Sequence, residues 1–413
     1  MMSDIKDITL APSGKQKIEW VKHYMPVLKS FEEEFAPEQP FAGYRACVCC
    51  HLEAKTAYLI QVMQACGASV AACASNPLST QDDVVAALVE GGVDVYAIHG
   101  ETPEVYDAHI KSALGTRPHT ILDDGGDVVT MLHKEMPHLL PNVLGASEET
   151  TTGVLRLKAM EQANALKIPV ISVNDAQCKY MFDNRYGTGQ SVWDGIMRTT
   201  NLIVAGKRVV VAGYGWCGKG VSKRAAALGA RVIVTEVDHI KATEALMDGF
   251  DVMSMDDAAA LGDVFVTVTG CEDVIVKRHF DRMKDGVLLA NAGHFDCEIN
   301  VAELARTSRE VMEMRHNVEG YVQDDGRILN VLAGGRLVNL ASGDGHPAEI
   351  MDMSFALQFL AQKYIVENYK DMQSGVLKLP RDIDYGVAVR KLRALGGNVD
   401  VLTKQQHKYL YGV

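Results

Sequence analysis

Long apolar runs are missing from this chain of 413 residues. No run approaches the roughly 18 or more residues that a membrane-spanning helix needs, and the first twenty, MMSDIKDITLAPSGKQKIEW, lack the apolar core of a signal peptide. Basic residues are also in deficit, because the formal net charge is -12, whereas a nucleic-acid binder usually carries a basic patch or excess. These absences predict a cytoplasmic protein that binds neither membranes nor nucleic acid.

Cysteines are few, nine in the whole chain, and the lack of a secretion signal predicts reduced thiols rather than disulfides. Three of them precede a histidine in the run Cys47-Val48-Cys49-Cys50-His51, which has the composition of half a metal site. Zinc sites normally separate paired ligands by about two to four residues and draw a second pair from elsewhere, and no second pair is found in this sequence. We therefore expect no metal, and buried, inert cysteines beside a pocket.

The length predicts two or three domains, and 47% hydrophobic residues, 23% charged residues and 36 glycines are typical of a soluble α/β enzyme. Residues 15–35 predict an amphipathic helix interrupted near Pro26. From about residue 43, short strand-like runs alternate with helical segments, which favours a parallel sheet covered on both faces. The predicted strands include YRACVCC, SVAACAS, VDVYAIH, HTILDDGG and PVISVND.

A second α/β unit begins near residue 201, where KRVVVAGYGWCGKGVSKRAAALGARVIVTEVD predicts a strand, a glycine turn, a helix and a strand. DVFVTVTG and GVLLANAG predict two further strands that end in glycine, where a crevice floor would lie. The fold class is therefore α/β, with two doubly wound parallel sheets. After about residue 345 the pattern becomes helical again, and a short segment, 376–413, follows.

A dinucleotide fingerprint stands in the second unit. Gly213-x-Gly215-x-x-Gly218 follows a predicted strand directly and opens a helix, and Glu236 ends the next strand. The glycines allow a tight turn, close approach of a pyrophosphate and helix–strand packing, while the helix N-terminus offers unpaired N–H groups to phosphates. The acid at 236 suits a ribose 2′-hydroxyl and would repel a 2′-phosphate, so the sequence predicts NAD rather than NADP.

Four charged clusters lie next to predicted strand ends or turns. They are ILDDGGD, ASEETTTG, VNDAQCKYMFDNRYG and the paired motifs NAGHFD and GDGHPAEIMDMSF. Lys179 and Asp183 in the third cluster are spaced i, i+4, which places them on one face of a helix. Taken singly, the acids have a structural interpretation as helix caps, and SEET resembles a capping box. Taken together beside a dinucleotide fold, the clusters favour one shared site, because ligands bind at the carboxyl ends of parallel strands.

With these motifs in order, the chain resembles the S-adenosyl-L-homocysteine hydrolase family over nearly its whole length. The matching stretches are STQDD, GETPEVY, ILDDGGD, SEETTTG, VND with FDNRYGTGQS, VAGYGWCGKG, VTEVD, VTVTGC, NAGHFD, RLVNL and GHPAEIM. The resemblance implies a substrate-binding domain formed by roughly 1–185 and 346–375, with an NAD-binding Rossmann domain, 190–343, inserted between them. It further implies that 376–413 packs on a neighbouring subunit of a homotetramer.

The resemblance also implies that NAD stays bound and is regenerated in every cycle, so that the net reaction is hydrolysis of a nucleoside thioether to a nucleoside and L-homocysteine. Oxidation of the 3′-hydroxyl to a ketone acidifies the C4′ proton, and the thiol then leaves C5′ by elimination. Water adds to the enone, and the ketone is reduced again. The protein supplies orientation and proton transfer.

Residue by residue, the resemblance assigns catalytic roles to five side chains. Lys179 and Asp183 match the family's pair at the ribose hydroxyls, and Lys179 would help to remove the 3′-OH proton once desolvated beside a positive nicotinamide. Asp124 matches the acid near C4′ and C5′. His51 and His294 match the two histidines that handle protons at C5′.

Further matches concern binding. Glu149 corresponds to the acid on the ribose 2′-hydroxyl side, His346 to a mobile-loop histidine that closes over the base, and Met351 and Phe355 to apolar walls around it. Asn184 corresponds to an asparagine beside the nicotinamide. The other matched NAD contacts, besides the glycines, are Thr150, Thr151, Thr152, Glu236, Asn291 and Asn339.

One departure from the family pattern bears on the substrate. The family usually reads His-Met-Thr-x-Glu-Thr-Ala at the first histidine, with the glutamate accepting from adenine's 6-amino group, whereas this chain reads HLEAKTA from His51. The Lys55 ammonium can only donate hydrogen bonds, and so can the 6-amino group of adenine. Placing these two donors against each other would cost a few kcal/mol of binding free energy. On hypoxanthine the donor and acceptor positions of the base are exchanged. Lys55 can donate to O6, and Glu53 can accept from N1–H. The pattern resembles the S-inosyl-L-homocysteine hydrolase branch; the alternative is a solvated helix start, on which residues i and i+2 would not pair.

A second departure lies at the C-terminus. Many family members carry a lysine and a tyrosine there that reach the neighbour's NAD, and the run ending Tyr411-Gly412-Val413 does not align with that tail. The sequence thus leaves three alternatives to an inosyl-specific hydrolase: an S-adenosyl-L-homocysteine hydrolase, a catalytically silent NAD-binding regulator, and a dehydrogenase that releases NADH.

Overall fold

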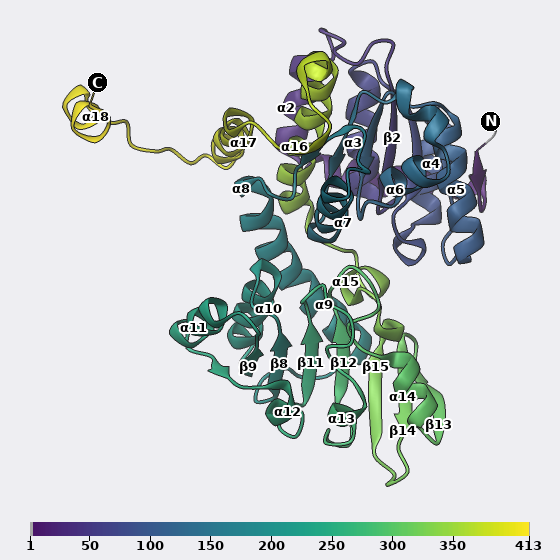
Figure 1. Ribbon diagram of the computed structural model, residues 1–413, viewed down its shortest axis with the longest axis vertical. Coiled ribbons are helices and arrows are strands. Elements are labelled where there is room, and N and C mark those ends of the chain that lie inside the picture. Colours follow the sequence, from purple (N-terminus) through teal and green to yellow (C-terminus); the bar gives the residue numbers. More distant parts are fainter. Residues whose placement is uncertain (1–2, 413) are drawn as a thin grey trace.

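Two eight-stranded sheets organise the computed structural model, which describes residues 3–412 (Figure 1). The first sheet has the order β1-β4-β3-β2-β5-β6-β7-β16, and all its neighbouring strands run parallel. Its strands are β1 (Asp4–Ile5), β2 (Arg45–Cys50), β3 (Ser69–Ala74), β4 (Asp94–Ala97), β5 (Thr120–Asp123), β6 (Gly145–Glu148), β7 (Pro169–Ser172) and β16 (Gly375–Lys378).

The second sheet has the order β10-β9-β8-β11-β12-β15-β14-β13. It is parallel from β10 to β15 and ends in two antiparallel strands, β14 and β13. Its strands are β8 (Arg208–Ala212), β9 (Arg231–Thr235), β10 (Asp251–Val252), β11 (Val264–Thr267), β12 (Leu288–Asn291), β13 (Glu310–Arg315), β14 (Val318–Val322) and β15 (Ile328–Leu332).

Helices cover the sheets. Those of the first half are α1 (Ala11–Lys22), α2 (Pro26–Phe35), α3 (Ala54–Ala65), α4 (Asp82–Glu90), α5 (Pro103–Gly115), α6 (Asp127–Lys134), α7 (Thr151–Gln162), α8 (Gln177–Lys179) and α9 (Thr188–Thr200). The later ones are α10 (Trp216–Ala227), α11 (His239–Met247), α12 (Met255–Ala258), α13 (Lys277–Phe280), α14 (Val301–Thr307), α15 (Val338–Ala341), α16 (Ala348–Asn368), α17 (Arg381–Ala394) and α18 (Lys404–Tyr411). Tyr180–Gly187 forms a π-helical segment between α8 and α9.

Strand β2 illustrates why both faces of the first sheet are covered. Successive side chains of a strand point to opposite faces, and here Val48 and Cys50 join one apolar core whereas Cys47 and Cys49 join another. The valines of β8 divide in the same way between two cores of the second sheet. Strands buried on both faces need continuous apolar runs, which these sequences supply. The predicted fold class, two doubly wound parallel sheets, is therefore confirmed.

The chain leaves the first sheet after β7 and returns to it along α16, whose inner face is buried (Figure 1). All strands of the second sheet lie inside the predicted insertion, 190–343. Strand β16 then pairs with β7, so the predicted boundary at 375 falls within a strand. The exact domain limits stay a prediction.

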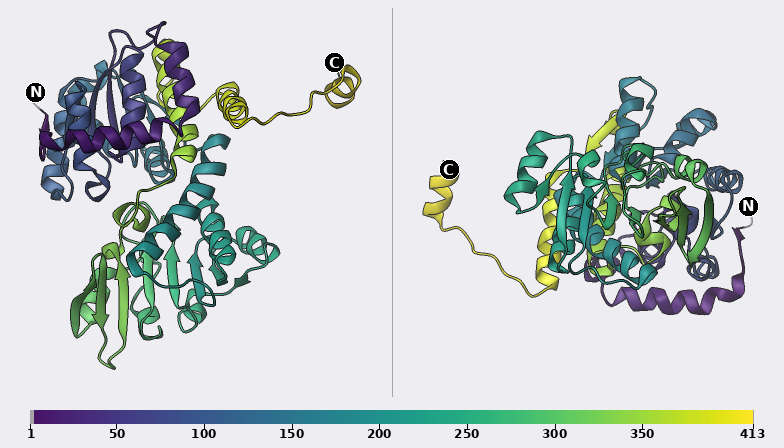
Figure 2. Two further views of the ribbon diagram at one scale, coloured as in Figure 1. Left: turned by 180° about the vertical axis from the view of Figure 1, so that it is seen from behind. Right: turned by 90° about the horizontal axis from the view of Figure 1, so that it is seen from below.

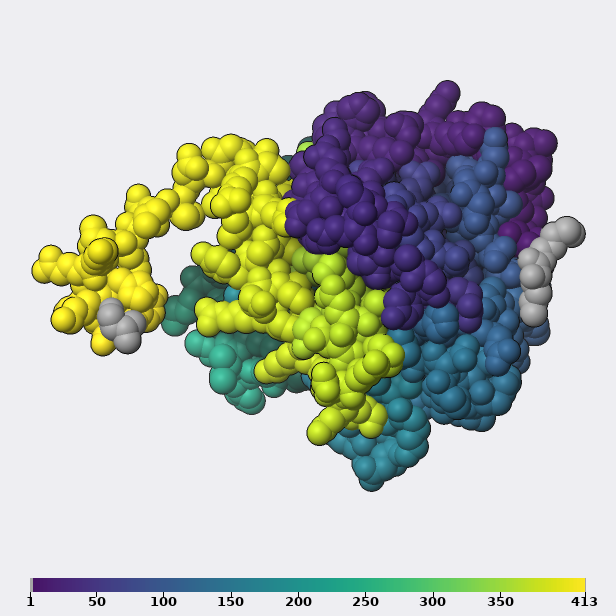
Figure 3. All heavy atoms as spheres, turned by 90° about the horizontal axis from the view of Figure 1, so that it is seen from above, coloured from purple at the N-terminus to yellow at the C-terminus, as the bar shows by residue number. Residues whose placement is uncertain are grey.

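Beyond α17, the C-terminal segment extends away from the body. Helix α17 packs beside α2, where Arg390 pairs with Glu34 at 2.7 Å, while α18 stands apart (Figures 2 and 3). The side chains of α18 are exposed, Tyr409 by 90%. Packing of this segment on a neighbouring subunit stays a prediction. Within the described residues, no helix combines the length and apolarity needed to cross a membrane.

Candidate active site

A cavity of about 1150 Å³ lies between the carboxyl ends of strands from the two sheets. Almost all of the side chains predicted for the site line it. They are His51, Glu53, Lys55, Asp124, Glu149, Thr150, Thr151, Thr152, Lys179, Asp183, Asn184, Gly213, Gly215, Glu236, His294, Asn339, His346, Met351 and Phe355. The structure therefore brings together residues that are up to some 300 positions apart in the sequence.

Two predicted residues do not line this cavity. A Cβ on Gly218 would lie 2.0 Å from the carbonyl oxygen of Gly213, so this glycine serves the close packing of α10 on the turn. Asn291 is fully buried and holds the following loop, accepting from the Gly293 amide at 2.8 Å and donating to the Phe295 carbonyl at 2.8 Å. Asn291 thus supports the loop of His294 instead of facing the cavity.

His51, Asp124 and two serines form one cluster at the ends of β2, β3 and β5. His51 Nε2 lies 3.4 Å from the Asp124 carboxylate, and its Nδ1 lies 2.7 Å from Ser79 Oγ. Ser75 donates to Asp124 at 2.9 Å. Burial lowers the pKa of His51 against the opposing effect of Asp124, so the neutral ring is favoured. A neutral imidazole beside a buried carboxylate can accept and return a proton.

His294 reaches this cluster from the second sheet. Its ring centroid lies 6.5 Å from that of His51, so the two imidazoles face the same part of the cavity. The ring rests against Gly125, whose φ is +115° and where a Cβ would come within 2.6 Å of His294 Nε2. This position of His294 therefore requires glycine at 125.

A second polar cluster surrounds Lys179. Its ammonium lies 2.9 Å from Asn184 Oδ1, 3.5 Å from the Glu149 carboxylate and 3.6 Å from that of Asp183. All three charged side chains are nearly inaccessible to solvent. The predicted i, i+4 proximity of Lys179 and Asp183 is found, although it arises where α8 passes into the π-helical segment.

Helix α16 and the segment before it hold these acids in place. Ser354 donates to Asp183 at 2.7 Å, Gln358 donates to Glu149 at 2.5 Å, and His346 Nδ1 lies 2.5 Å from Asp183. Burial raises the pKa of Asp183, but Lys179, His346 and Ser354 outweigh it and hold the pKa well below its usual range. Burial raises the pKa of Glu149 to about 8.

The same arrangement bears on the expected proton loss from Lys179. Burial lowers its pKa, but Asp183 and Glu149 outweigh burial, so the pKa is raised and the protein alone favours the ammonium form. Desolvation was expected to favour loss of a proton from the Lys179 ammonium, but two adjacent carboxylates offset its effect on the pKa. Lys179 can act as a base only if the pKa increase caused by the two carboxylates is reduced. A further positive charge nearby, or protonation of one carboxylate, would reduce it.

Glu53 and Lys55 form a buried ion pair that also lines the cavity. Glu53 caps α3 by accepting from the backbone N–H groups of Lys55 and Thr56, and its carboxylate lies 2.9 Å from Lys55 Nζ. Lys55 Nζ also donates to the backbone carbonyl of Asp344 at 2.9 Å. Both side chains are about 95% buried, so a solvated helix start is wrong. The expectation that i and i+2 would not pair is also wrong, because Glu53 precedes the helix and its extended backbone lets the carboxylate fold back.

The glycine turn after β8 forms the other wall. Gly213 adopts a φ of +101°, and a Cβ on Gly215 would project into free space, so the backbone is accessible to a phosphate group. The Glu236 carboxylate accepts from the amides of Tyr214 at 2.7 Å, Val237 at 2.7 Å and Asp238 at 3.1 Å, which leaves acceptor capacity on Oε2 for a ribose hydroxyl. Asn339 Oδ1 is buried without a hydrogen-bond partner among the described residues. These features fit a dinucleotide.

Sequence reasoning missed the supporting residues of both clusters. Ser75 and Ser79 follow β3 in a loop, and although Ser79 opens the matching stretch STQDD, neither serine was assigned a role. Ser354 and Gln358 did leave a signal, since with Gln362 they place a polar side chain every four residues along the apolar helix α16. Within residues 3–412, no group of three or more His, Cys, Asp and Glu side chains is arranged to hold a metal ion.

Comparison with known proteins identifies relatives along the whole chain. Residues 2–139 match the family model described as S-adenosyl-L-homocysteine hydrolase, and residues 184–345 match its NAD binding domain. An adenosylhomocysteinase of Pyrococcus abyssi is 58% identical over 98% of this chain and 96% of its own length. S-inosyl-L-homocysteine hydrolases of Methanococcus maripaludis and Methanocaldococcus jannaschii are each 52% identical over 99% of this chain and 98% of theirs.

Proposed function

Because this chain belongs to the S-adenosyl-L-homocysteine hydrolase family, a family of hydrolases with an NAD-binding domain, we propose that it hydrolyses S-inosyl-L-homocysteine to inosine and L-homocysteine. The reaction is reversible. Relatives at similar identity carry either the adenosyl or the inosyl name, so overall similarity does not choose between the two bases. The choice rests on the base end of the cavity.

The observation that carries the proposal is the buried pair of Glu53 and Lys55. Two hydrogens of the Lys55 ammonium are engaged by the Glu53 carboxylate and the Asp344 carbonyl, which leaves a third to donate to a ligand. Hypoxanthine offers an acceptor, O6, and a donor, N1–H, which suit Lys55 and Glu53 respectively. Adenine would place its 6-amino donor against the ammonium, at a cost of about 1–3 kcal/mol. Met351 and Phe355 supply the apolar walls beside the pair.

The cofactor of the family is NAD, and the turn at Gly213 and Gly215 with Glu236 fits it. When bound, NAD supplies the hydride acceptor for the ribose 3′ carbon and later the donor that restores it. We assign Thr150, Thr151, Thr152, Asn184 and Asn339 to its surroundings, since they line the same cavity as the glycine turn and match the family's NAD contacts.

At the ribose, Glu149 and Asp183 bind hydroxyls, and Lys179 takes the proton of the 3′-hydroxyl as the hydride leaves. The positive charge of a bound nicotinamide offsets the two carboxylates that otherwise hold the proton on Lys179. Asn184 orients the amine by accepting at 2.9 Å. These residues thus prepare the ketone that acidifies C4′–H.

At C5′ the chain moves protons between carbon, sulfur and water. Asp124 lies where it can accept the C4′ proton; the electron pair of that bond forms the C4′–C5′ double bond as C5′–S breaks. In its protonated form, His51 or His294 gives a proton to the departing thiolate and becomes neutral; the neutral ring then deprotonates the water that adds to C5′, while Asp124 returns its proton to C4′. The neutral ring of His51 and its contacts to Asp124 and Ser79 support its role as the base toward water.

The decisive experiment is a competition between S-inosyl- and S-adenosyl-homocysteine in one reaction. We expect kcat/KM for the inosyl substrate to exceed that for the adenosyl substrate by about 5- to 150-fold, the equivalent of about 1–3 kcal/mol. A larger value for the adenosyl substrate would overturn the proposal in favour of adenosylhomocysteinase activity. Release of homocysteine with turnover, without NADH in solution, excludes a silent regulator and a simple dehydrogenase.

A further inference from the structure

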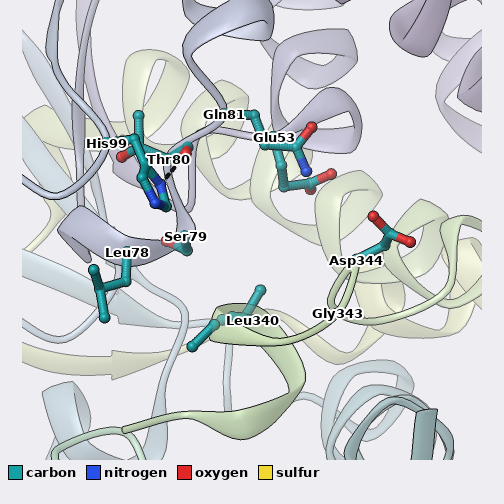
Figure 4. Close-up of a pocket in the computed structure, with 10 residues that line it drawn as sticks. Glu53, Leu78, Ser79, Thr80, Gln81, His99, Leu340, Gly343 and Asp344 are labelled. Carbon is teal, nitrogen blue, oxygen red and sulfur yellow. Dashed lines mark hydrogen bonds between the residues drawn. The ribbon is translucent and has the colours of Figure 1, made fainter. Parts of the chain in front are cut away.

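Side chains from other parts of the chain hold the segments that carry the residues of the site. Figure 4 shows one case, at a small cavity of about 140 Å³ beside the large one. There His99, which follows β4, lies with Nδ1 2.9 Å from the backbone carbonyl of Thr80, in the loop that carries Ser79. Helix α8, which carries Lys179, is held in a comparable way by a side chain of α17.

The first turn of α8 has no capping side chain of its own. Its N-cap is Ala176, whose methyl group cannot accept a hydrogen bond. The Lys179 amide donates to the backbone carbonyl of Ala176 at 3.0 Å, within the turn itself. The amides of Gln177 and Cys178 have no such acceptor in the helix, so they need one from elsewhere in the chain.

Asp384 of α17 supplies both acceptors. Its carboxylate accepts from the Gln177 amide at 2.7 Å and from the Cys178 amide at 2.9 Å. The Cys178 thiol also donates to the backbone carbonyl of Asp384 at 3.3 Å. Asp384 is buried, so these charge-assisted bonds are shielded from solvent and fix the start of α8 firmly.

Helix α17 is itself fixed by buried charge. Its buried residues, Asp384, Val387 and Lys391, are spaced i, i+3 and i+7 and so lie on one face. Lys391 Nζ lies 2.9 Å from the carboxylate of Asp352 on α16, and Asp352 is fully buried. Because separating such a pair leaves a buried charge without a partner, α17 resists displacement. Asp384 therefore offers α8 a rigid attachment.

The position of α8 determines where the Lys179 amine lies. The ammonium has neighbours at 2.9 Å in Asn184, 3.5 Å in Glu149 and 3.6 Å in Asp183. Glu149 belongs to a different segment, before α7, where Gln358 holds it. A shift of α8 would therefore move the amine relative to Glu149, and a displacement of about 1 Å can cost about 100-fold in rate.

We propose that Asp384 is a positioning residue for Lys179: by capping α8, it fixes the amine where it can take the proton of the ribose 3′-hydroxyl. Asp384 does not line the large cavity, so it acts through α8 and not on the substrate. This inference rests on the proposed function, since it concerns the residue that takes this proton there.

The test is reduction of NAD in the holoenzyme by saturating inosine without a thiol, followed in a single turnover by the near-ultraviolet absorbance of the reduced nicotinamide. We expect Asp384→Ala to lower the rate constant by about 10- to 100-fold, because both amides lose their acceptor. Asp384→Asn should restore part of the rate, since its amide oxygen remains an acceptor. The half-saturating inosine concentration should change little, because the contacts of Glu149 with Gln358 and of Asp183 with Ser354 are retained.

Matched controls are available on the same helix. Asp382→Ala and Asp382→Asn make the same changes in the exposed first turn of α17 and should leave the rate constant unchanged. A role in stability alone would lower the amplitude, since less holoenzyme would be folded, but not the rate constant. That result would overturn the proposal, as would a wild-type rate constant in every Asp384 variant that folds, or an equal fall in the Asp382 variants.

The wild-type holoenzyme distinguishes a failure of this inference from a failure of the proposed function. Reduction of NAD by inosine at a rate constant that does not depend on Asp384 removes this inference alone. Reduction by adenosine but not by inosine removes the proposed base preference, and the Asp384 variants are then compared with adenosine. Reduction by neither nucleoside removes the proposed function and this inference with it.

Discussion

If Glu53 and Lys55 recognise the base as proposed, exchanging them for the usual family residues should reverse the substrate preference. In Glu53→Thr with Lys55→Glu, the acceptor returns to position 55 and can accept from a 6-amino group, while the ammonium that favours O6 is lost. Each reversed contact changes the preference by about 1–3 kcal/mol, since a satisfied bond becomes a buried mismatch. Neighbouring effects do not add fully, so we expect the ratio of kcat/KM, inosyl over adenosyl, to fall by about 100-fold or more.

The structure also specifies the single variants and the control. Lys55→Glu alone would set two buried carboxylates against each other, because Glu53 Oε2 lies 2.9 Å from Lys55 Nζ, so both substrates should suffer and the midpoint of thermal unfolding should fall. Lys29→Glu with Glu33→Thr, on the exposed face of α2, makes similar charge changes away from the cavities. The assay is competition between the two thioethers. An unchanged ratio in a folded double variant would refute base recognition by these residues.

Three further predictions follow from contacts around the site. Gly293→Ala places a Cβ within 1.7 Å of Glu298 Oε1, so we expect a loss of about 1–3 kcal/mol in the free energy of unfolding and a lower kcat from a displaced His294; full activity at wild-type stability would contradict this. Ser354→Ala removes a donor that helps to lower the pKa of Asp183, so the acidic limb of the pH–rate profile should move to higher pH, and an unmoved limb would show that Asp183 does not set it. Burial raises the pKa of Asp123 to about 7, so the folded state binds the carboxyl proton more tightly than the unfolded state does. The free energy of unfolding should therefore decline as the pH rises towards about 7. Chemical denaturation of Asp123→Asn should show a weaker decline over the same pH range.

Much of the fold could be predicted because buried parallel strands have a distinctive composition. Runs such as RVVVA and RACVCC are apolar on both faces, so their alternation with helices indicated the sheets directly. Strand β6, GASE, was missed because four small and polar residues carry no such signal, and the neighbouring SEET suggested a capping box instead. In the structure, Thr150 is the N-cap of α7 and Glu148 ends the strand.

The sequence could predict which residues line the cavity, but it predicted less well which of their atoms contact one another. Strand-end acids and histidines were placed in the cavity because carboxyl ends of parallel strands converge. Helical spacing did not predict the pairing of Glu53 with Lys55. Glu53 is the N-cap of α3, and the pairing depends on its extended backbone. Asn291 looked like a cofactor contact, yet its amide is used up by the loop below His294. Which atoms these side chains contact depends on tertiary packing, and the spacing of residues along the chain does not predict it.

We propose that helix α16 connects recognition of the base with the chemistry at the ribose. Met351 and Phe355 line the cavity, while Ser354 and Gln358, on the same side of the helix, hold Asp183 and Glu149. Under this proposal, a base that fits poorly against Lys55 displaces the helix and with it the two acids assigned to the ribose, where small displacements reduce the rate strongly.

We therefore expect the wrong base to lower kcat as well as to raise KM. Single-turnover reduction of bound NAD isolates this step: at saturating nucleoside, adenosine should reduce it more slowly than inosine. Loosening the helix contact in Phe355→Ala should narrow that difference in rate while weakening the binding of both nucleosides. Equal rates at saturation in the wild type would show that base and ribose are read independently, because a difference confined to binding affinity needs no mechanical connection between the two ends of the cavity.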